Sequence, residues 1–443
     1  MEAVAAVRRD IEHVRVLTAR EVGSGEASIF DAHLSLLTDA EMLADVKTRT
    51  SAGVGAVSAW AGCLDDVERA WANLPDPYLR ERAADVHAVA EQVVRALTGE
   101  PGRRMTAPGV LVADDLTPTE AAGLDLDLVT GVLLAQERAV SRDGVAVAVA
   151  ANLGSVADAR AALAAGADGA GLVRTEFLFL GRSEAPGVEE QEQEYVAIGE
   201  ALGGRRVTLR SLDVGGDKPL PYLPVVREDN PFLGLRGLRL ALARPALLHD
   251  QLVAVCRAAR RTPTSLMFPM VSTAAELRAA RATLDAAAGP SGVPGDLRVG
   301  MMVEVPAAAL KIESFLPLLD FVSIGTNDLT QYALAAERGN PAVAGLADAL
   351  DPAVLQLIDR VCQASRGRVD VAVCGEVAAD TAAVALLVGL GVRELSVGPH
   401  AVPRVKERVR ALDLEQCQVV AKQALSLESA DEVREFAHAA LGC

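Results

Sequence analysis

The chain has 443 residues, of which 51% are hydrophobic and only 3% aromatic, and its formal net charge is −17. This length allows two or three domains that each have a core of their own. The acidic charge excludes general binding to nucleic acids or anionic membranes, so any bound anion must meet a local cluster of arginines.

The sequence has no feature of an exported or membrane-spanning chain. No run of about 18 apolar residues occurs, so no transmembrane span is expected. The first residues lack the charged-then-apolar order of a signal peptide. The six cysteines are scattered without a Cys-x-x-Cys pair, which predicts reduced thiols in a cytoplasmic protein; they are Cys63, Cys256, Cys362, Cys374, Cys417 and Cys443.

The first hundred residues are predicted to form paired helical hairpins. Apolar residues recur at spacings of three and four, as on one face of a helix, in the series Val4, Val7, Ile11 and Val14. The same pattern returns over residues 60–74 and 86–97, and turns are expected at residues 23–25 and 75–77. We expect Trp60 and Trp71 to pack in the core, and we assign residues 1–104 to a helical domain.

Residues 109–136 form a short α/β segment in the prediction. A strand is expected at residues 110–113, a helix opened by residues 117–120, and a second strand at residues 128–135. Such a fragment is shorter than the roughly 40 residues that usually support an independent core. We therefore interpret residues 105–143 as the remnant of a larger domain, together with a linker, or as a segment that leans on a neighbour.

From residue 146 onward the pattern becomes a regular β/α alternation. Eight apolar, β-branched runs are predicted as strands buried on both faces, at residues 146–151, 171–176, 206–212, 265–271, 298–305, 321–326, 371–375 and 392–397. Capping-box signals at Ser155 and Thr273 begin helices, and Gly166 and Gly289 end them. Eight such repeats predict a (β/α)8 TIM barrel over residues 144–443, with a doubly wound sheet as the alternative.

Charged residues close several of the predicted strands. Catalytic groups of such barrels lie at the C-terminal ends of the strands, and a charge at that position is costly to bury unless it has a partner. Arg174 and Arg210 provide planar donor forks suited to phosphate or carboxylate. Glu304 and Asp328 are hard oxygen ligands of the kind that Mg²⁺ accepts.

Two further residues extend this set. Arg338 follows Asp328 by ten residues and is expected to reach back over the same mouth. Cys374 is a candidate acid or base toward carbon. Each residue alone is better read as an ion-pair partner or a small buried side chain, but together they favour a site for a small phosphorylated acid and a divalent metal.

Six strings in the barrel carry a resemblance to a known family. They are residues 174–179 (RTEFLF), 213–218 (DVGGDK), 230–236 (NPFLGLR), 304–308 (EVPAA), 323–332 (SIGTNDLTQY) and 374–376 (CGE). These strings resemble Enzyme I of the phosphoenolpyruvate-dependent sugar phosphotransferase system, the phosphoenolpyruvate–protein phosphotransferases. Residues 30–37 and 78–86 resemble the helical domain of that family, which docks the phosphocarrier protein HPr.

The resemblance implies a role for each matching residue. It implies that Glu304 and Asp328 hold Mg²⁺ and that Cys374 protonates the enolate carbon as pyruvate forms. It further implies that the remaining residues bind phosphoenolpyruvate together with Asp328; these are Arg174, Arg210, Arg236, Asn327 and Arg338. A cytoplasmic homodimer that pairs through the barrel and serves sugar transport is also implied.

The sequence departs from the family at the phosphate acceptor. The family's acceptor histidine stands in a Gly-Gly-x-x-Ser-His context, and this string does not occur. Residues 129–135 resemble the strand that leads to it, and residues 137–144 are already predicted as the entry to the barrel, so we expect most of the phosphohistidine domain to be absent. The six histidines stand in other settings, and His400, near the last strand, is the candidate closest to the barrel mouth; the others are His13, His33, His87, His249 and His438.

Three hypotheses follow from these observations. The first is an Enzyme I-like phosphotransferase that passes phosphate toward HPr. The second is a phosphoenolpyruvate-using barrel enzyme without a phosphohistidine step. The third is a catalytically incomplete regulatory module that binds phosphoenolpyruvate.

Overall fold

The computed structural model describes residues 2–21, 34, 37–63, 93–94, 96–98, 109–113, 129–134, 137–215, 220–223, 228–338 and 340–442. The chain divides into two compact units, residues 1–134 and 135–443. The helical pattern around Trp71, the helix expected from residue 117, and the residues His33 and His87 lie outside the described residues.

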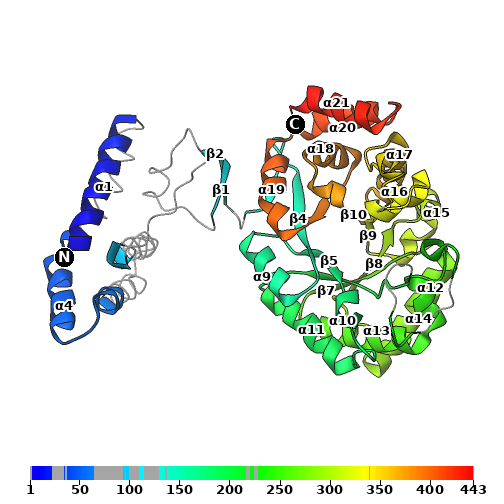
Figure 1. The fold of residues 1–443 in the computed structure, drawn as a ribbon, viewed down its shortest axis with the longest axis horizontal. Coiled ribbons are helices and arrows are strands. Elements are labelled where there is room, and N and C mark those ends of the chain that lie inside the picture. Colours follow the sequence, from blue (N-terminus) through cyan, green and yellow to red (C-terminus); the bar gives the residue numbers. More distant parts are fainter. Residues whose placement is uncertain are drawn as a thin grey trace. The chain divides into compact units, whose positions relative to one another are not determined.

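The first unit contains helices α1 (Glu2–Glu21) and α4 (Ala40–Ser51), shown in blue in Figure 1. The predicted apolar face of α1 is confirmed for Val4, Val7 and Ile11, which are buried. They belong to a core cluster that includes Trp60, whose side chain is 1% exposed. Trp60 is therefore a core residue, as predicted.

The first unit also contains two short strands, β1 (Gly109–Ala113) and β2 (Val129–Leu134). They pair in parallel, with Leu111 opposite Val132. Both strands were predicted within one residue of these bounds. Parallel neighbours require a crossover connection rather than a hairpin. This pairing agrees with the strand–helix–strand order predicted for residues 109–136.

The second unit is a closed barrel of eight parallel strands (Figure 1), which confirms the predicted TIM barrel. The sheet runs in sequence order and closes where β11 pairs with β4. The strands are β4 (Ala146–Leu153), β5 (Ala170–Arg174), β6 (Val207–Arg210), β7 (Thr264–Phe268), β8 (Arg298–Val303), β9 (Phe321–Ile324), β10 (Asp370–Val373) and β11 (Glu394–Val397). A two-residue strand, β3 (Ala139–Val140), adds to β4 in antiparallel orientation.

Helices surround the barrel and begin where the sequence signals predicted. Thr273 and Glu276 form a reciprocal capping box at the start of α14, and Gly289 ends that helix with a φ of +61°. Ser155 caps α9 by accepting a hydrogen bond from the amide of Asp158. The helices are α9 (Val156–Ala164), α10 (Glu176–Phe179), α11 (Val188–Ala201), α12 (Leu238–Ala243), α13 (Pro245–Ala259), α14 (Ala274–Ala288), α15 (Pro306–Leu310), α16 (Thr326–Leu334), α17 (Pro352–Ser365), α18 (Thr381–Leu390), α19 (Val402–Ala411), α20 (Leu414–Ala424) and α21 (Ala430–Leu441).

A small apolar cluster fills the interior of the barrel. It consists of Leu172, Met267, Met302, Phe321 and Cys374, all of which are buried. Phe321 is the first residue of β9, whereas Cys374 directly follows the last residue of β10. The cluster thus extends from the N-terminal to the C-terminal end of the strands, and the charged residues lie at the two ends of the barrel.

Candidate active site

The predicted site residues gather at the C-terminal end of the barrel. Arg174 and Arg210 are the last residues of β5 and β6. Glu304 directly follows β8, and Cys374 directly follows β10. Asp328 lies in the first turn of α16, the helix that follows β9. Because all eight strands are parallel, their carboxyl ends meet at one face, which explains this convergence.

A chain of alternating charges is buried at this face. The guanidinium of Arg210 donates to Glu176 at 2.6 Å and lies 3.0 Å from the carboxylate of Asp213. Asp213 also accepts from Nε of Arg236 at 3.1 Å. Arg236 in turn donates two hydrogen bonds to Asp328, at 3.1 and 3.0 Å. Neither Arg210 nor Arg236 is therefore a free donor fork, because carboxylates already engage both.

Buried carboxylates exceed buried guanidiniums in this cluster. Glu304 is 1% exposed and accepts a hydrogen bond from the amide of Met270 at 2.6 Å. Burial, together with the nearby charges of Asp328 and Asp213, raises the pKa of Glu304 to about 8. A divalent cation beside Glu304 and Asp328 would offset this excess negative charge. The donor set of hard carboxylate oxygens therefore fits Mg²⁺.

Met270 explains how Glu304 is held. Its backbone adopts a left-handed φ of +56°, which is uncommon for a residue with a long side chain. This conformation follows the end of β7 and directs the Met270 amide at the Glu304 carboxylate. Strained backbone of this kind persists only where the surroundings enforce it. No local pattern in the sequence predicts this contact.

Two other arginines at this end remain open to solvent. Arg174 and Arg338 are exposed, and neither side chain has a hydrogen-bond or ion-pair partner among the residues that the structure describes. Asn327 and Glu376 exchange two hydrogen bonds, from Asn327 Nδ2 to Glu376 Oε1 and from the Glu376 amide to Asn327 Oδ1. Asn327, Arg338 and Glu376 all line a cavity of about 380 Å³. Arg338 therefore offers free donors to an anion in this cavity, whereas Arg174 lines a separate cavity beside the end of β5.

Cys374 lies on the inner side of the same end. Its thiol is buried and donates toward the carbonyl of Ile324, with the sulfur 3.7 Å from that oxygen. Burial raises the pKa of the thiol to about 11, so Cys374 carries a proton at neutral pH. The side chain of Asn152 donates to the carbonyls of Cys374 and Ser396 and fixes this position from β4. Cys374 can thus donate a proton but does not act as a thiolate.

Two carboxylates of the cluster had no assigned role in the sequence analysis. Glu176 and Asp213 follow β5 and β6 and were visible as charges after strands. Their signal was the cost of burying a charge without a partner. The sequence did not predict that these carboxylates would occupy Arg210 and Arg236, because the contacts join residues up to 34 positions apart.

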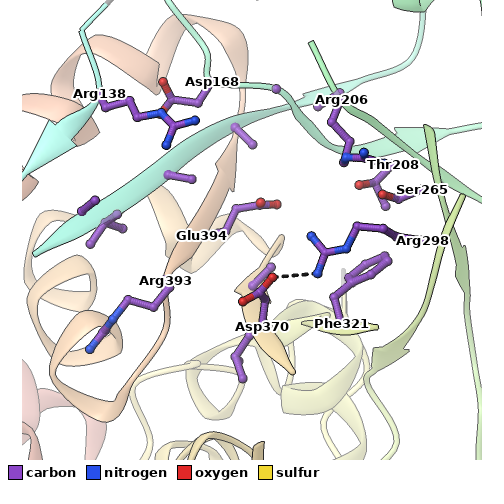
Figure 2. Close-up of a pocket in the computed structure, with 18 residues that line it drawn as sticks. Arg138, Asp168, Arg206, Thr208, Ser265, Arg298, Phe321, Asp370, Arg393 and Glu394 are labelled. Atoms are coloured by element: carbon purple, nitrogen blue, oxygen red, sulfur yellow. Dashed lines mark hydrogen bonds and ion pairs between the residues drawn. The ribbon is translucent and has the colours of Figure 1, made fainter. Parts of the chain in front are cut away.

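A second cavity, of about 340 Å³, opens at the N-terminal end of the barrel strands (Figure 2). Its charges are largely paired: Arg206 binds Asp296 at 2.9 Å and Arg298 binds Asp370 at 2.7 Å. Glu394 projects into this end, and burial raises its pKa to about 7. The active sites of TIM barrels lie at the opposite end, and this cavity contains none of the predicted site residues.

The histidines within the described residues lie on the surface. His249 on α13 and His438 on α21 are exposed. His400 is also exposed and belongs to the 3₁₀ helix η7 (Pro399–Ala401), which follows the carboxyl end of β11. It therefore lies at the same end of the barrel as the charged cluster. The side chain of His13 is outside the described set.

Within the described residues, no group of three or more His, Cys, Asp or Glu side chains forms a ready-made metal site. The two predicted ligands Glu304 and Asp328 would thus supply only part of a coordination shell, as is usual for Mg²⁺. In the same part of the chain, no helix combines the length and apolar character needed to cross a membrane. The five described cysteines are free and buried.

Two family models match this chain. The model described as "PEP-utilising enzyme, PEP-binding domain" matches residues 132–414, and the model described as "PEP-utilising enzyme, N-terminal" matches residues 1–82. The first of these covers all eight strands of the barrel and every residue of the charged cluster.

Curated relatives match along almost the entire chain. A phosphoenolpyruvate-protein phosphotransferase of Haloferax volcanii is 36% identical, with 98% of this chain and 91% of the relative covered. The protein of the same name from Bacillus subtilis is 32% identical with the same coverage. A multiphosphoryl transfer protein of Xanthomonas campestris is 35% identical, and the match covers 61% of its length.

The alignment with the Haloferax protein extends over 513 positions, whereas the chain has 443 residues. Part of the relative therefore has no counterpart here. This difference agrees with the shortened α/β segment that precedes the barrel in the sequence.

Proposed function

The chain belongs to the phosphoenolpyruvate-utilising enzymes, in the family of phosphoenolpyruvate–protein phosphotransferases, and on this premise we propose that the C-terminal end of its barrel binds phosphoenolpyruvate with Mg²⁺. The observation that carries the proposal is the combination of a buried excess of carboxylates with two exposed, unengaged guanidiniums. The first suits a cation and the second suits an anion, and both lie at one end of the barrel.

Glu304 and Asp328 would hold the metal. Their carboxylate oxygens are hard ligands, and burial first, then the charges of Asp328 and Asp213, raises the pKa of Glu304. When bound, Mg²⁺ would neutralise charge that develops on the phosphoryl group. Arg236 donates to the same Asp328 carboxylate that would bind the metal, and it keeps that carboxylate oriented when substrate is absent.

Arg174 and Arg338 would clamp the phosphoryl and carboxylate groups of the substrate, because their donors are free to form charge-assisted hydrogen bonds. Arg210, Arg236 and Asn327 complete the wall of donors. The guanidinium of Arg210 has a buried Nε without a hydrogen-bond partner among the described residues. This orphan donor supports a role of Arg210 toward a substrate oxygen.

Cys374 would complete the reaction at carbon. As the bond between phosphorus and the enol oxygen breaks and a bond from phosphorus to an acceptor nitrogen forms, the enolate needs one proton on its methylene carbon to become pyruvate. The thiol carries that proton, since its pKa is about 11. Water then restores the proton to the sulfur, and atoms and charge balance.

The acceptor completes the proposal. A histidine nitrogen receives the phosphoryl group, which then passes toward HPr, and the helical first unit is the candidate docking surface. This chain lacks the acceptor string of the family, and the labelling experiment below identifies the acceptor of the first transfer. We further propose that the protein acts in the cytoplasm, in sugar transport, as a dimer formed through the barrel.

One experiment tests these steps in order. The full chain is incubated with Mg²⁺ and phosphoenolpyruvate labelled at phosphorus, with and without HPr, and both phosphoprotein and pyruvate are measured. Label on the chain or on HPr supports transfer to a protein. Pyruvate and free phosphate without labelled protein would indicate a barrel enzyme without a phosphohistidine step, and binding without turnover would indicate a regulatory module.

A further inference from the structure

Gln251 lies on α13, outside the charged cluster, and its amide is buried with 1% of the residue exposed. Its Oε1 accepts a hydrogen bond from the backbone amide of Leu212 at 2.9 Å. Its Nε2 donates to the hydroxyl of Thr175 at 3.1 Å and to that of Tyr195 at 3.2 Å. The amide thus uses its carbonyl and both N–H groups, so none of its donors is left unpaired.

The partners of Gln251 stand between the residues of the candidate active site. Leu212 lies between Arg210 and Asp213, just beyond the end of β6. Thr175 lies between Arg174 and Glu176, just beyond the end of β5. One side chain therefore joins the two neighbouring strand ends that carry these charges.

A further bond closes the connection. The hydroxyl of Thr175 donates to the carbonyl of Arg210 at 2.8 Å, so that β5 and β6 are also bridged directly. That hydroxyl has one proton, which it gives to Arg210, and it accepts from Gln251. The donor and acceptor roles in this network are therefore fixed. The Leu212 amide can only donate, so the Gln251 carbonyl must face it.

Orientation at this point matters for the chemistry proposed above. A misplacement of about 1 Å in a positioning element can reduce turnover by about 100-fold. Residues 211–214, which follow β6, belong to no helix or strand, and the Leu212 amide donates its hydrogen bond to Gln251.

We propose that Gln251 is a positioning residue for phosphoryl transfer, because its amide locks the end of β6 to the end of β5 and so sets Arg210 and Asp213 against Arg174 and Glu176. Gln251 touches no reacting group itself. The inference rests on the proposed function of this end of the barrel and assigns to α13 the task of aligning it.

The test compares Gln251→Leu with Gln191→Leu. Gln191 is equally buried, lies on α11, accepts from the same Tyr195 hydroxyl at 3.2 Å, and donates to the carbonyl of Pro186, away from both strand ends. Each variant removes one buried amide and its hydrogen bonds. We expect both to lower the unfolding midpoint, but only Gln251→Leu to lower kcat by at least 10-fold at a temperature where both are folded. The phosphoenolpyruvate-dependent label and pyruvate assay measures kcat and KM separately.

A second pair of variants addresses the Thr175 link. Thr175→Val removes the hydroxyl with little change of shape and should reduce kcat as Gln251→Leu does, whereas Thr175→Ser keeps the hydroxyl and should restore it. Because both side chains act through one network, kcat of the double variant Gln251→Leu, Thr175→Val should be no lower than kcat of the worse single variant. Equal kcat values for Gln251→Leu and Gln191→Leu, or multiplicative losses in the double variant, would overturn the proposal.

A readout that does not depend on turnover separates this inference from the proposed function. Hydrogen exchange at the Leu212 amide should be faster by at least 10-fold in Gln251→Leu than in Gln191→Leu. If the parent protein turned over no phosphoenolpyruvate but this difference held, the proposed function would fail and the structural lock would stand. If the exchange rates were equal, the lock itself would be wrong.

Discussion

Arg236 and Asp328 form a two-pronged ion pair across the barrel mouth, with Nη1 3.1 Å from Oδ1 and Nη2 3.0 Å from Oδ2. Nε of the same arginine contacts Asp213, and the guanidinium lies 5.7 Å from the ring centre of Phe232. Arg236 therefore joins the ends of β6 and β9 through contacts that neither strand makes itself. This pair determines the orientation of the Asp328 carboxylate, which is a predicted metal ligand.

We predict that Arg236→Met destabilises the protein strongly. The change leaves Asp213 and Asp328 without their shared partner, and removal of one member of a buried pair costs about 3–5 kcal/mol. Urea unfolding followed by circular dichroism measures the loss. Arg257→Met is the control, because Arg257 pairs with Glu189 at the surface and should cost less than about 1 kcal/mol. Similar losses in the two variants would contradict the buried network.

The exposed arginines should behave in the opposite way. Arg174→Ala and Arg338→Ala break no hydrogen bond or ion pair of the guanidinium within the described structure, so the free energy of unfolding should change by less than about 0.5 kcal/mol. A charge-assisted hydrogen bond to substrate contributes about 1.5–3 kcal/mol, so kcat/KM for phosphoenolpyruvate should fall about 10- to 100-fold. Steady-state pyruvate formation measures this, with Arg360→Ala as the surface control. An unchanged kcat/KM would remove both residues from the site.

Glu304→Gln is expected to separate function from stability. Glutamine still accepts the hydrogen bond from Met270 and cannot ionise in its buried position beside Asp213 and Asp328, so stability should be unchanged or increased. The concentration of Mg²⁺ that gives half-maximal pyruvate formation should rise at least 10-fold. Glu313→Gln, on the surface, provides the control. A variant with normal Mg²⁺ dependence would show that Glu304 is not a metal ligand.

Cys374→Ala should uncouple loss of phosphate from protonation at carbon. We expect pyruvate formation to fall by at least 100-fold, while binding of phosphoenolpyruvate, measured by calorimetry, changes less than threefold. The same buried thiol should resist alkylation by iodoacetamide at neutral pH, since its raised pKa keeps it protonated. Cys362→Ala is a matched control, because Cys362 is also buried but lies on α17, outside the mouth. Equal activities of the two alanine variants would exclude Cys374 as the proton donor.

Glu394 predicts a pH dependence of stability. Its pKa is raised from 4.5 to about 7 by burial, with Arg298 lowering it and Asp370 and Asp168 raising it. Between these pH values the native state binds more protons than the unfolded state, so the free energy of unfolding decreases as pH rises. Glu394→Gln removes this penalty and should gain up to about 3 kcal/mol on the wild type between pH 5 and pH 8.

Chemical unfolding at both pH values measures this gain. Glu415→Gln on the surface of α20 serves as the control. A Glu394→Gln variant whose stability relative to wild type is the same at pH 5 and pH 8 would contradict the raised pKa.

The barrel could be predicted because its signals are local. Eight apolar runs and the caps at Ser155 and Thr273 depend on residues a few positions apart, and all reappear in the structure. The strand ends were less exact: the run predicted at 265–271 ends at Phe268, after which Met270 turns to φ +56°. Residues beyond a strand are shaped by their long-range partners, which a local pattern does not contain.

The sequence by itself determined the barrel, the family, and the set of charged residues that meet at the carboxyl ends of its strands. That set follows from parallel strand order, because each strand delivers its last residues to the same face. Only the tertiary structure decided which of the four arginines are occupied: Arg210 and Arg236 by carboxylates, and Arg174 and Arg338 by none among the described residues. The reason is physical, since a charge that is buried must find a partner in space, and the partner's distance along the chain has no effect on that requirement.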